Sequence, residues 1–304
     1  MISIDLETLL TILYVWIDDW YKAYGQVWMG KKAGRQAVFK DSEMLTLMIA
    51  QEYIPYPAER QYVGFMRANY RDLFPCLVDQ SQFNRRARAL GPVLEALRQA
   101  WLVEMGVGQG QDYLLDTKPV PVMGYKRSKK HSDFAGSAAY GYCASRQLHY
   151  FGYKLVMITT LEGVPVVYDL VPANTDERRA ADAVLDKLTH AHVIADKGFL
   201  GLAWQAEVQA QTGNRVTTPK RANQHAQHPD GLEPLLNALR ERIEGVFHEL
   251  QHTGRPLEHL LAKTVLGLAT RLIAKVTAHL LRYWLRLQYG IDVQSFLWPA
   301  HRAF

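Results

Sequence analysis

Cysteine and long uncharged apolar runs are both scarce in this chain of 304 residues. Its two cysteines, Cys76 and Cys143, are too few for a disulfide framework or a four-cysteine metal site. The most apolar stretch, 260–287, is interrupted by five Lys or Arg residues, so we expect no membrane span. The first residues lack the basic region of a signal peptide. These absences together predict a protein of a reducing cytoplasm.

Acidic residues are nearly absent after His259, where Asp292 stands against six Lys or Arg residues. This local excess equals the net charge of the whole chain, +5. Four of these cations, Arg271, Lys275, Arg282 and Arg286, fall on one side of a predicted helix. A cationic stripe without acids favours contact with DNA phosphates over a solvated amphipathic face, although an ordinary enzyme can also be this basic.

The hydrophobic pattern changes its period near residue 108, between a helical part and a part rich in strands. Helical spacing is found over 5–20, from Asp41 until Pro55 and Pro57 end the helix, and over 81–104, and glycines punctuate 106–111. The strands that we expect further on are 113–116, 150–160, 164–171, 192–196 and 215–218. Helices are predicted over 176–188, 200–211, 232–251 and 257–288. Because the second and third strands form an antiparallel hairpin, the order predicts a mixed α/β sheet, not a doubly wound parallel one.

Three carboxylates occupy positions where a charge needs a partner. Asp116 and Asp196 each end an apolar strand, and Glu244 lies beside the apolar face of a predicted helix. Each aspartate alone is better explained as a cap of a turn. Brought together, the three would repel one another, and hard divalent cations such as Mg²⁺ would relieve that repulsion. Two such ions, about 3.5–4 Å apart, activate an attacking hydroxyl and stabilise the leaving oxygen at a phosphodiester.

Several short motifs follow one another in a specific order around these carboxylates. They are Leu115–Val122, Lys126–Lys130, Tyr150–Leu155, Pro172–Asp176, Ala195–Gly201, Thr218–Asn223 and Arg240–Glu244. In this order they resemble the DDE-type insertion-sequence transposases, most closely the insertion-sequence 982 group, over about residues 40–285. Related transposases have Tyr and Lys where this chain has Asn237 and Gln251, which leaves the roles of these two positions open.

The resemblance implies an RNase H-like catalytic core over 109–304, after a helical DNA-binding or dimerisation domain over 1–108. It implies that Asp116, Asp196 and Glu244 hold two Mg²⁺ ions, for which Mn²⁺ substitutes. The expected reaction is cleavage at the element ends and transfer of the 3′-hydroxyl into target DNA. The expected partners are double-stranded DNA, as terminal inverted repeats and target, and at least a second copy of the chain. The expected location is the nucleoid of a bacterium or archaeon.

Basic side chains in four places are candidates for contact with DNA. They are Arg85, Arg86 and Arg88 on a helix, Lys126, Arg127, Lys129 and Lys130 in a loop, Lys197, Lys220, Arg221 and Arg240 within the motifs, and the stripe Arg271, Lys275, Arg282 and Arg286. For the loop and the first helix, solvated surface residues are the alternative interpretation.

Two other functions are compatible with the sequence. The segment His248–His252 reads H-E-x-x-H, which on a helix can bind Zn²⁺ and form a metalloprotease site. That site needs a third ligand, and the extended form has Gly and His where this chain has Arg255 and Glu258. The second alternative is a catalytically inactive, DNA-binding relic of a transposase.

Overall fold

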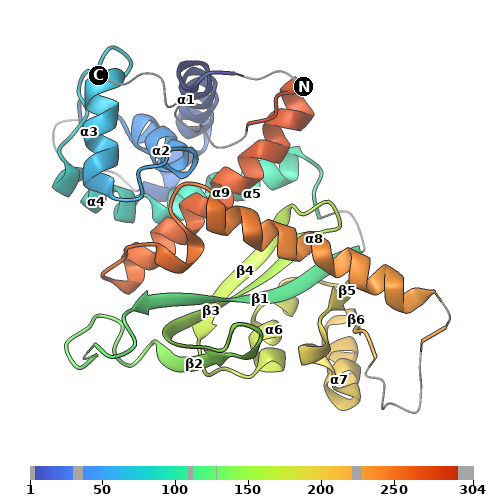
Figure 1. The fold of residues 1–304 in the computed structure, drawn as a ribbon. Coiled ribbons are helices and arrows are strands. Elements are labelled where there is room, and N and C mark those ends of the chain that lie inside the picture. The colour runs from blue at the N-terminus through green and yellow to red at the C-terminus, as the bar shows by residue number, and fades with distance from the viewer. Residues whose placement is uncertain are drawn as a thin grey trace. The chain divides into compact units, whose positions relative to one another are not determined.

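The structure is a computed structural model, which describes residues 4–29, 37–108, 112–127, 129–220, 228–229 and 231–293. The chain packs into two compact units (Figure 1). A helical unit combines Met1–Met105 with Leu250–Phe304, and a sheet unit comprises Gly106–Glu249. The functional division at residue 108 stays a prediction, because packing does not show what each part binds. Within the described ranges no helix is long and apolar enough to span a membrane.

Three helices of the helical unit begin within one residue of the predicted starts at 5, 41 and 81. Its α-helices are α1 (Leu6–Ala23), α2 (Asp41–Ala50), α3 (Glu59–Asn69), α4 (Gln80–Ala89), α5 (Gly91–Glu104) and α9 (Val265–Tyr289). The Asp5 carboxylate accepts a hydrogen bond from the Thr8 amide at 2.8 Å and so caps α1. The Glu43 carboxylate accepts one from the Lys40 amide at 2.6 Å at the start of α2.

Two of the predicted helices were too long. The helix predicted over 81–104 is interrupted at Leu90, because Pro92 stands in the first turn of α5 and starts a new helix there. The helix predicted over 257–288 consists of a short 3₁₀ turn, Leu257–His259, and then α9. The Thr264 hydroxyl accepts a hydrogen bond from the Gly267 amide at 3.1 Å, which sets the true start of α9.

The sheet unit has the mixed topology that the hairpin predicted. Its strands are β1 (Asp112–Met123), β2 (Ala139–Cys143), β3 (Leu148–Thr160), β4 (Pro165–Pro172), β5 (His192–Ala195) and β6 (Arg215–Thr217). They run in the order β2-β3-β1-β5-β6, and β4 also pairs with β3. The pairs that involve β3 are antiparallel, whereas β1, β5 and β6 are mutually parallel.

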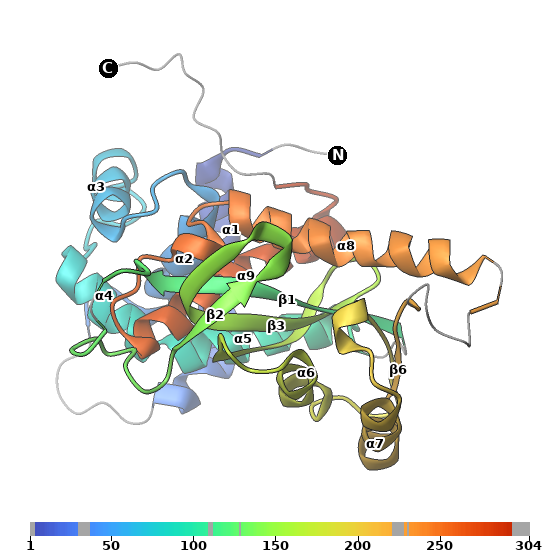
Figure 2. The same ribbon diagram turned by 60° about the horizontal axis from the view of Figure 1, so that its bottom comes forward.

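Helices cover both faces of this sheet (Figures 1 and 2). They are α6 (Glu177–Leu185), α7 (Leu202–Thr212) and α8 (Leu232–His252). On one face, α6 and α7 close an apolar core that includes Leu115, Val156, Val184, Ala195 and Val208. On the opposite face, α8 buries its apolar stripe, which includes Leu236, Ile243 and Phe247. One guanidinium on α8, that of Arg242, donates a 2.9 Å hydrogen bond to the Leu161 carbonyl in the β3–β4 turn.

Two features of the sheet differ from the sequence prediction. The strand predicted over 113–116 continues to Met123, despite Pro119 and Pro121. Proline is tolerated there because β5 pairs with β1 only as far as Leu115, which leaves one edge of β1 without a strand partner among the described residues. The strand β2 escaped prediction because it alternates between half-buried and exposed residues and has no apolar run.

We predict that Gly152→Ala destabilises the sheet unit by about 1–3 kcal/mol, the usual cost of overpacking. An ideal Cβ on Gly152 would lie 2.2 Å from the Val120 carbonyl oxygen, so β1 and β3 would have to separate. The matched control is Gly245→Ala on α8, where nothing lies within 4 Å and the better helix propensity of Ala should be slightly stabilising. Urea unfolding of both variants checks this, and equal stability would contradict it.

Candidate active site

The pairing of two parallel strands brings two of the predicted carboxylates together. In the register of β1 with β5, Leu115 pairs with Ala195, and Asp116 and Asp196 are the next residue on each strand. Leu115 and Ala195 point into the core under α6 and α7. Because successive residues of a strand point to opposite faces, the Asp116 side chain belongs to the face that α8 covers. Asp196 follows the end of β5 and caps a 3₁₀ turn, with its carboxylate accepting from the Lys197 amide.

The third carboxylate, that of Glu244, is linked to Asp196 by an arginine on the same helix, α8. The Arg240 guanidinium lies 2.9 Å from an oxygen of Asp196 and 3.6 Å from an oxygen of Glu244, one helical turn further along. Arg240 is mostly buried, whereas 59% of the Glu244 side chain is exposed. The guanidinium therefore stands as a cation between two carboxylates that come from different elements.

Burial and neighbouring charges both act on Asp116. Burial, and to a smaller extent the negative charges of Asp196 and Glu244, raise the pKa of Asp116 to about 7. A hydrogen bond from the Thr117 amide, 2.7 Å long, and the Arg240 charge act in the opposite direction. Asp116 is thus a carboxyl group whose ionised form needs an additional cation.

These groups fit divalent cations by their chemistry, since all of them are hard carboxylate oxygens. The pKa of Asp116 is raised mainly because the carboxyl group is buried, so its ionised form is poorly solvated without a cation. Within the described ranges, however, no three His, Cys, Asp or Glu side chains are close enough together to hold a metal ion. Glu244 and Asp196 meet at Arg240 instead, so metal binding would require the guanidinium to give way.

A comparison with known protein families shows to which family this chain belongs. The family model described as "Transposase DDE domain" matches residues 108–281, which is more than half of the chain. The chain therefore belongs to this family, and its sheet with the covering helices is an RNase H-like core, as predicted. It is a transposase of the nuclease and nucleotidyltransferase class, in a family that acts on DNA and generally uses divalent metal ions. No curated protein and no solved structure matches it.

The basic residues predicted near the carboxylates have different environments. Lys126, Arg127, Lys130 and Lys197 are exposed. Lys129 instead donates to the carbonyls of its own loop, at 2.6 Å to Gly124 and 2.7 Å to Tyr125. The amide of Lys220 donates to Glu233 at 2.6 Å. Arg221 lies outside the described residues.

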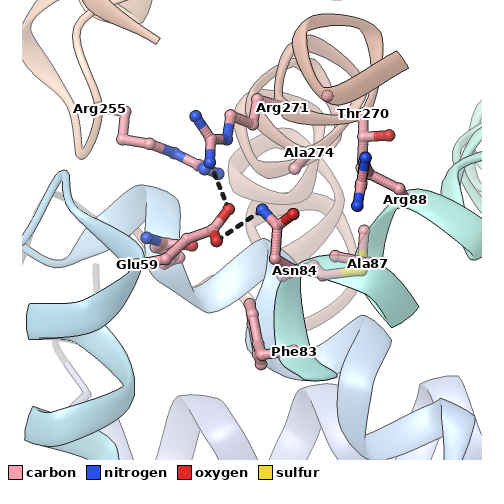
Figure 3. Close-up of a pocket in the computed structure, with 12 residues that line it drawn as sticks. Glu59, Phe83, Asn84, Ala87, Arg88, Arg255, Thr270, Arg271 and Ala274 are labelled. Carbon is pink, nitrogen blue, oxygen red and sulfur yellow. Dashed lines mark hydrogen bonds and ion pairs between the residues drawn. The ribbon is translucent and has the colours of Figure 1, made fainter. Parts of the chain in front are cut away.

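Two of the four residues in the predicted cationic stripe on α9 are paired with buried carboxylates of the helical unit. Lys275 is only 1% exposed and pairs with Glu52, which also pairs with Arg255. Figure 3 shows Arg271 meeting Glu59, at 2.6 Å. The prediction that Arg271 and Lys275 contact DNA is not supported, because these cations neutralise buried carboxylates. Of the other two, Arg282 lies 3.8 Å from Asp292 and Arg286 is exposed.

Of the three arginines on α4, one is exposed and two contact other residues of the helical unit. Arg85 is exposed. Arg86 pairs with Asp41 at 2.6 Å and lies over the Phe39 ring. Arg88 lines the small pocket of Figure 3, together with Asn84 and Arg271. Only Arg85 has the environment expected of a DNA contact.

The H-E-x-x-H segment lies on α8, as that motif requires, but acquires no third ligand. His248 and His252 are both exposed, and neither belongs to a metal-binding group of three in the described part of the chain. The structure therefore adds no support to a zinc protease.

Sequence analysis missed one carboxylate near the second aspartate. Glu177, in the first turn of α6, lies against the turn after Asp196, and an ideal Cβ on Gly198 would lie 1.8 Å from its Oε2. Glycine at 198 therefore gives this side chain room. The residue directly follows the Pro172–Asp176 motif, which was the available signal.

We predict that the stability of the metal-free protein falls as the pH rises through about 7, because of Asp116. The pKa of this group is about 7 in the folded state and ordinarily 3.8, so the folded protein binds the proton more tightly. Its contribution is complete below about pH 4 and is lost above pH 7. At pH 8, Asp116→Asn should therefore be more stable than wild type, by up to ~4 kcal/mol.

Chemical denaturation of both proteins between pH 5 and pH 8, with a chelator present, measures this difference. Added Mn²⁺ should stabilise wild type and leave Asp116→Asn unchanged. Parallel pH profiles of the two proteins would show that Asp116 ionises normally.

We also predict that Lys275→Ala costs ~3–5 kcal/mol of stability, because it leaves the Glu52 carboxylate buried with one cation fewer. Arg286→Ala, on the exposed part of the same helix, should change stability by less than about 0.5 kcal/mol. Urea unfolding compares the two. A Lys275→Ala protein that is fully stable but binds DNA weakly would restore the stripe hypothesis.

Proposed function

We propose that this chain cuts DNA at the ends of an insertion sequence and joins the freed 3′-hydroxyl to target DNA. The observation that carries the proposal is the register of β1 and β5, which sets Asp116 beside Asp196, with Arg240 linking Asp196 to Glu244. The order of the sequence motifs supports a place in the insertion-sequence 982 group. We further propose that it acts at the nucleoid of a bacterium or archaeon.

Asp116, Asp196 and Glu244 are the proposed ligands of two Mg²⁺ ions, for which Mn²⁺ substitutes. When bound, such ions would lower the pKa of the attacking water or hydroxyl and stabilise charge on the leaving oxygen. The hard oxygen donors and the raised pKa of Asp116 support this assignment.

The protein's own residues orient the carboxylates and the phosphate. Arg240 holds Asp196 at 2.9 Å, and a guanidinium has five N–H donors, so some remain for a phosphate. Lys197 is exposed directly beside Asp196 and is placed to attract the DNA backbone. Lys126, Arg127, Lys130, Arg85 and Arg286 remain as exposed candidates for weaker, sequence-independent contacts.

Two DNA ends have to be brought together before strand transfer, so we propose at least a homodimer on double-stranded DNA. We assign end binding or dimerisation to residues 1–108 and catalysis to 109–304. The helices of the first part and the exposed Arg85 on α4 support this division.

The proposal predicts that Asp196→Asn loses both cleavage and joining. Oligonucleotides copied from the DNA that flanks the gene are incubated with Mg²⁺ or Mn²⁺ and a target plasmid. Wild type should cut at a defined end and join it to the plasmid, whereas the variant should show only the enzyme-free background. The isosteric amide keeps the size of the side chain but removes the charge that a cation needs.

His248→Ala is the matched control on α8 and should retain wild-type activity. Binding of the ends without cleavage would point to an inactive relic. Loss of a proteolytic activity in His248→Ala, with no activity on DNA in wild type, would support the zinc protease.

A further inference from the structure

We propose that a patch of aromatic side chains on the β2–β3 hairpin binds unpaired DNA bases by stacking. This patch, the hairpin aromatic surface, consists of Tyr125, Tyr140, Tyr142, His149 and Phe151. The inference rests on the proposed function, since it takes the DNA to be a strand of the transposition substrate. It adds a binding site that lies apart from the carboxylates.

The pairing of the strands assembles this surface. In the antiparallel register of β2 and β3, Tyr140 stands opposite Phe151 and Tyr142 opposite His149. Residues directly opposite each other share a face of the sheet, so these four rings form one patch. Ring centres lie 5.0 Å apart for Tyr140 and Phe151 and 4.5 Å apart for Tyr142 and His149. Tyr125, from the loop after β1, adds its ring at 5.3 Å from Tyr140.

The tyrosines of this surface are unusually exposed for such large rings. Tyr125, Tyr140 and Tyr142 retain 48%, 52% and 54% of their accessible surface, while Phe151 beneath them is buried. A cluster of exposed rings leaves apolar area in water that a ligand can cover. Flat apolar faces with polar rims match nucleobases, which stack on aromatic side chains.

A network of interactions around Lys129 holds the loop against the rings. Its ammonium lies 5.6 Å from the centre of the Tyr140 ring and 5.2 Å from that of Phe151. The same ammonium donates to the carbonyls of Gly124 and Tyr125. Lys129 therefore positions Tyr125 beside the hairpin, which is a different role from the phosphate contact that the sequence predicted.

The charge around the rings complements a nucleic acid strand. Between residues 123 and 151 the chain carries five Lys or Arg residues against one acid, Asp133. Lys126, Arg127 and Lys130 are exposed in the loop that carries Tyr125. Stacking rings beside a cationic backbone track are the combination that single-stranded nucleic acids bind. Paired bases would expose only their edges and phosphates, so exposed rings add little for a duplex.

The surface faces the same side of the sheet as the proposed catalytic carboxylates. Along β3, His149, Phe151 and Met157 alternate onto one face, and Met157 pairs with Asp116. From Asp116 to Met123, the end of β1, seven residues of strand span ~24 Å. That length corresponds to about seven base steps of B-form DNA. The carboxylates and the hairpin aromatic surface therefore lie on the same side of the sheet, at opposite ends of this length of β1.

Binding of labelled oligonucleotides tests the proposal without any cleavage. A fluorescein-labelled single strand of about 12 nucleotides and the matching duplex are titrated with wild type and with Tyr140→Ala/Tyr142→Ala, without divalent metal. The Kd for the single strand should rise ~5- to 100-fold in the variant, the range expected for lost stacking on one base. The Kd for the duplex should change by less than about 2-fold.

Two controls isolate stacking from folding and from general binding. Tyr140→Phe/Tyr142→Phe keeps the rings and should bind the single strand like wild type. Tyr24→Ala removes an equally exposed tyrosine, 66% accessible, from the end of α1 in the helical unit and should have no effect. In wild type, photocrosslinking of a 5-iodouracil oligonucleotide should label the peptide that contains Tyr140 and Tyr142, which keeps the test valid if the Ala variant fails to fold.

Equal weakening of single-strand and duplex binding, unchanged single-strand binding in the Ala variant, or crosslinks only outside 125–151 would each overturn the inference. Failure of the proposed function would give a different set of results. In that case wild type would not cleave element ends, while the Asp196→Asn and wild-type proteins would bind the single strand equally through these rings.

Discussion

The burial of the Asp116 carboxylate beside Asp196, where β1 pairs with β5, is the constraint on which the candidate site depends. The parallel pairing of β1 and β5 stops at Leu115 and Ala195, and the next residues are both aspartates. Without a cation between them, two carboxylates would not both stay ionised at neutral pH. Arg240 pairs with Asp196 and Glu244, whereas the pKa of Asp116 stays raised, mainly because the group is buried. The site is therefore electrostatically prepared for further cations.

The helical unit also contains buried carboxylates, and they are neutralised by ion pairs within that unit. Glu52 and Glu59 are buried, and each is neutralised by cations that come from the other end of the chain, at Arg255, Arg271 and Lys275. Burying one of these charges alone would be very costly, so the ion pairs tie the C-terminal helix to the N-terminal ones. Arg271 and Lys275, two of the four residues of α9 that resembled a DNA-binding stripe, serve this packing.

Several local features were predictable because they depend on neighbouring residues. The start of α1 next to Asp5, the β3–β4 hairpin and the apolar stripe of α8 follow from periodicity and turn chemistry. The three carboxylates were found because each stands at a recognisable place in an ordered series of motifs. Other features depend on partners distant in sequence. The length of β1 is determined by β3, and β2 forms a strand because Tyr140 and Tyr142 pair with Phe151 and His149.

The sequence by itself determined the mixed α/β class, the transposase resemblance and the identity of the candidate carboxylates, because these depend on residue type and order. The tertiary structure decided which of the basic side chains are exposed and therefore accessible to DNA. A helical wheel places Lys275 and Arg286 on the same side of α9, but only packing shows that one is buried against Glu52 while the other is exposed. It likewise decided that Tyr125, Tyr140 and Tyr142 gather at one surface, since strand pairing, which no local pattern encodes, brings them together.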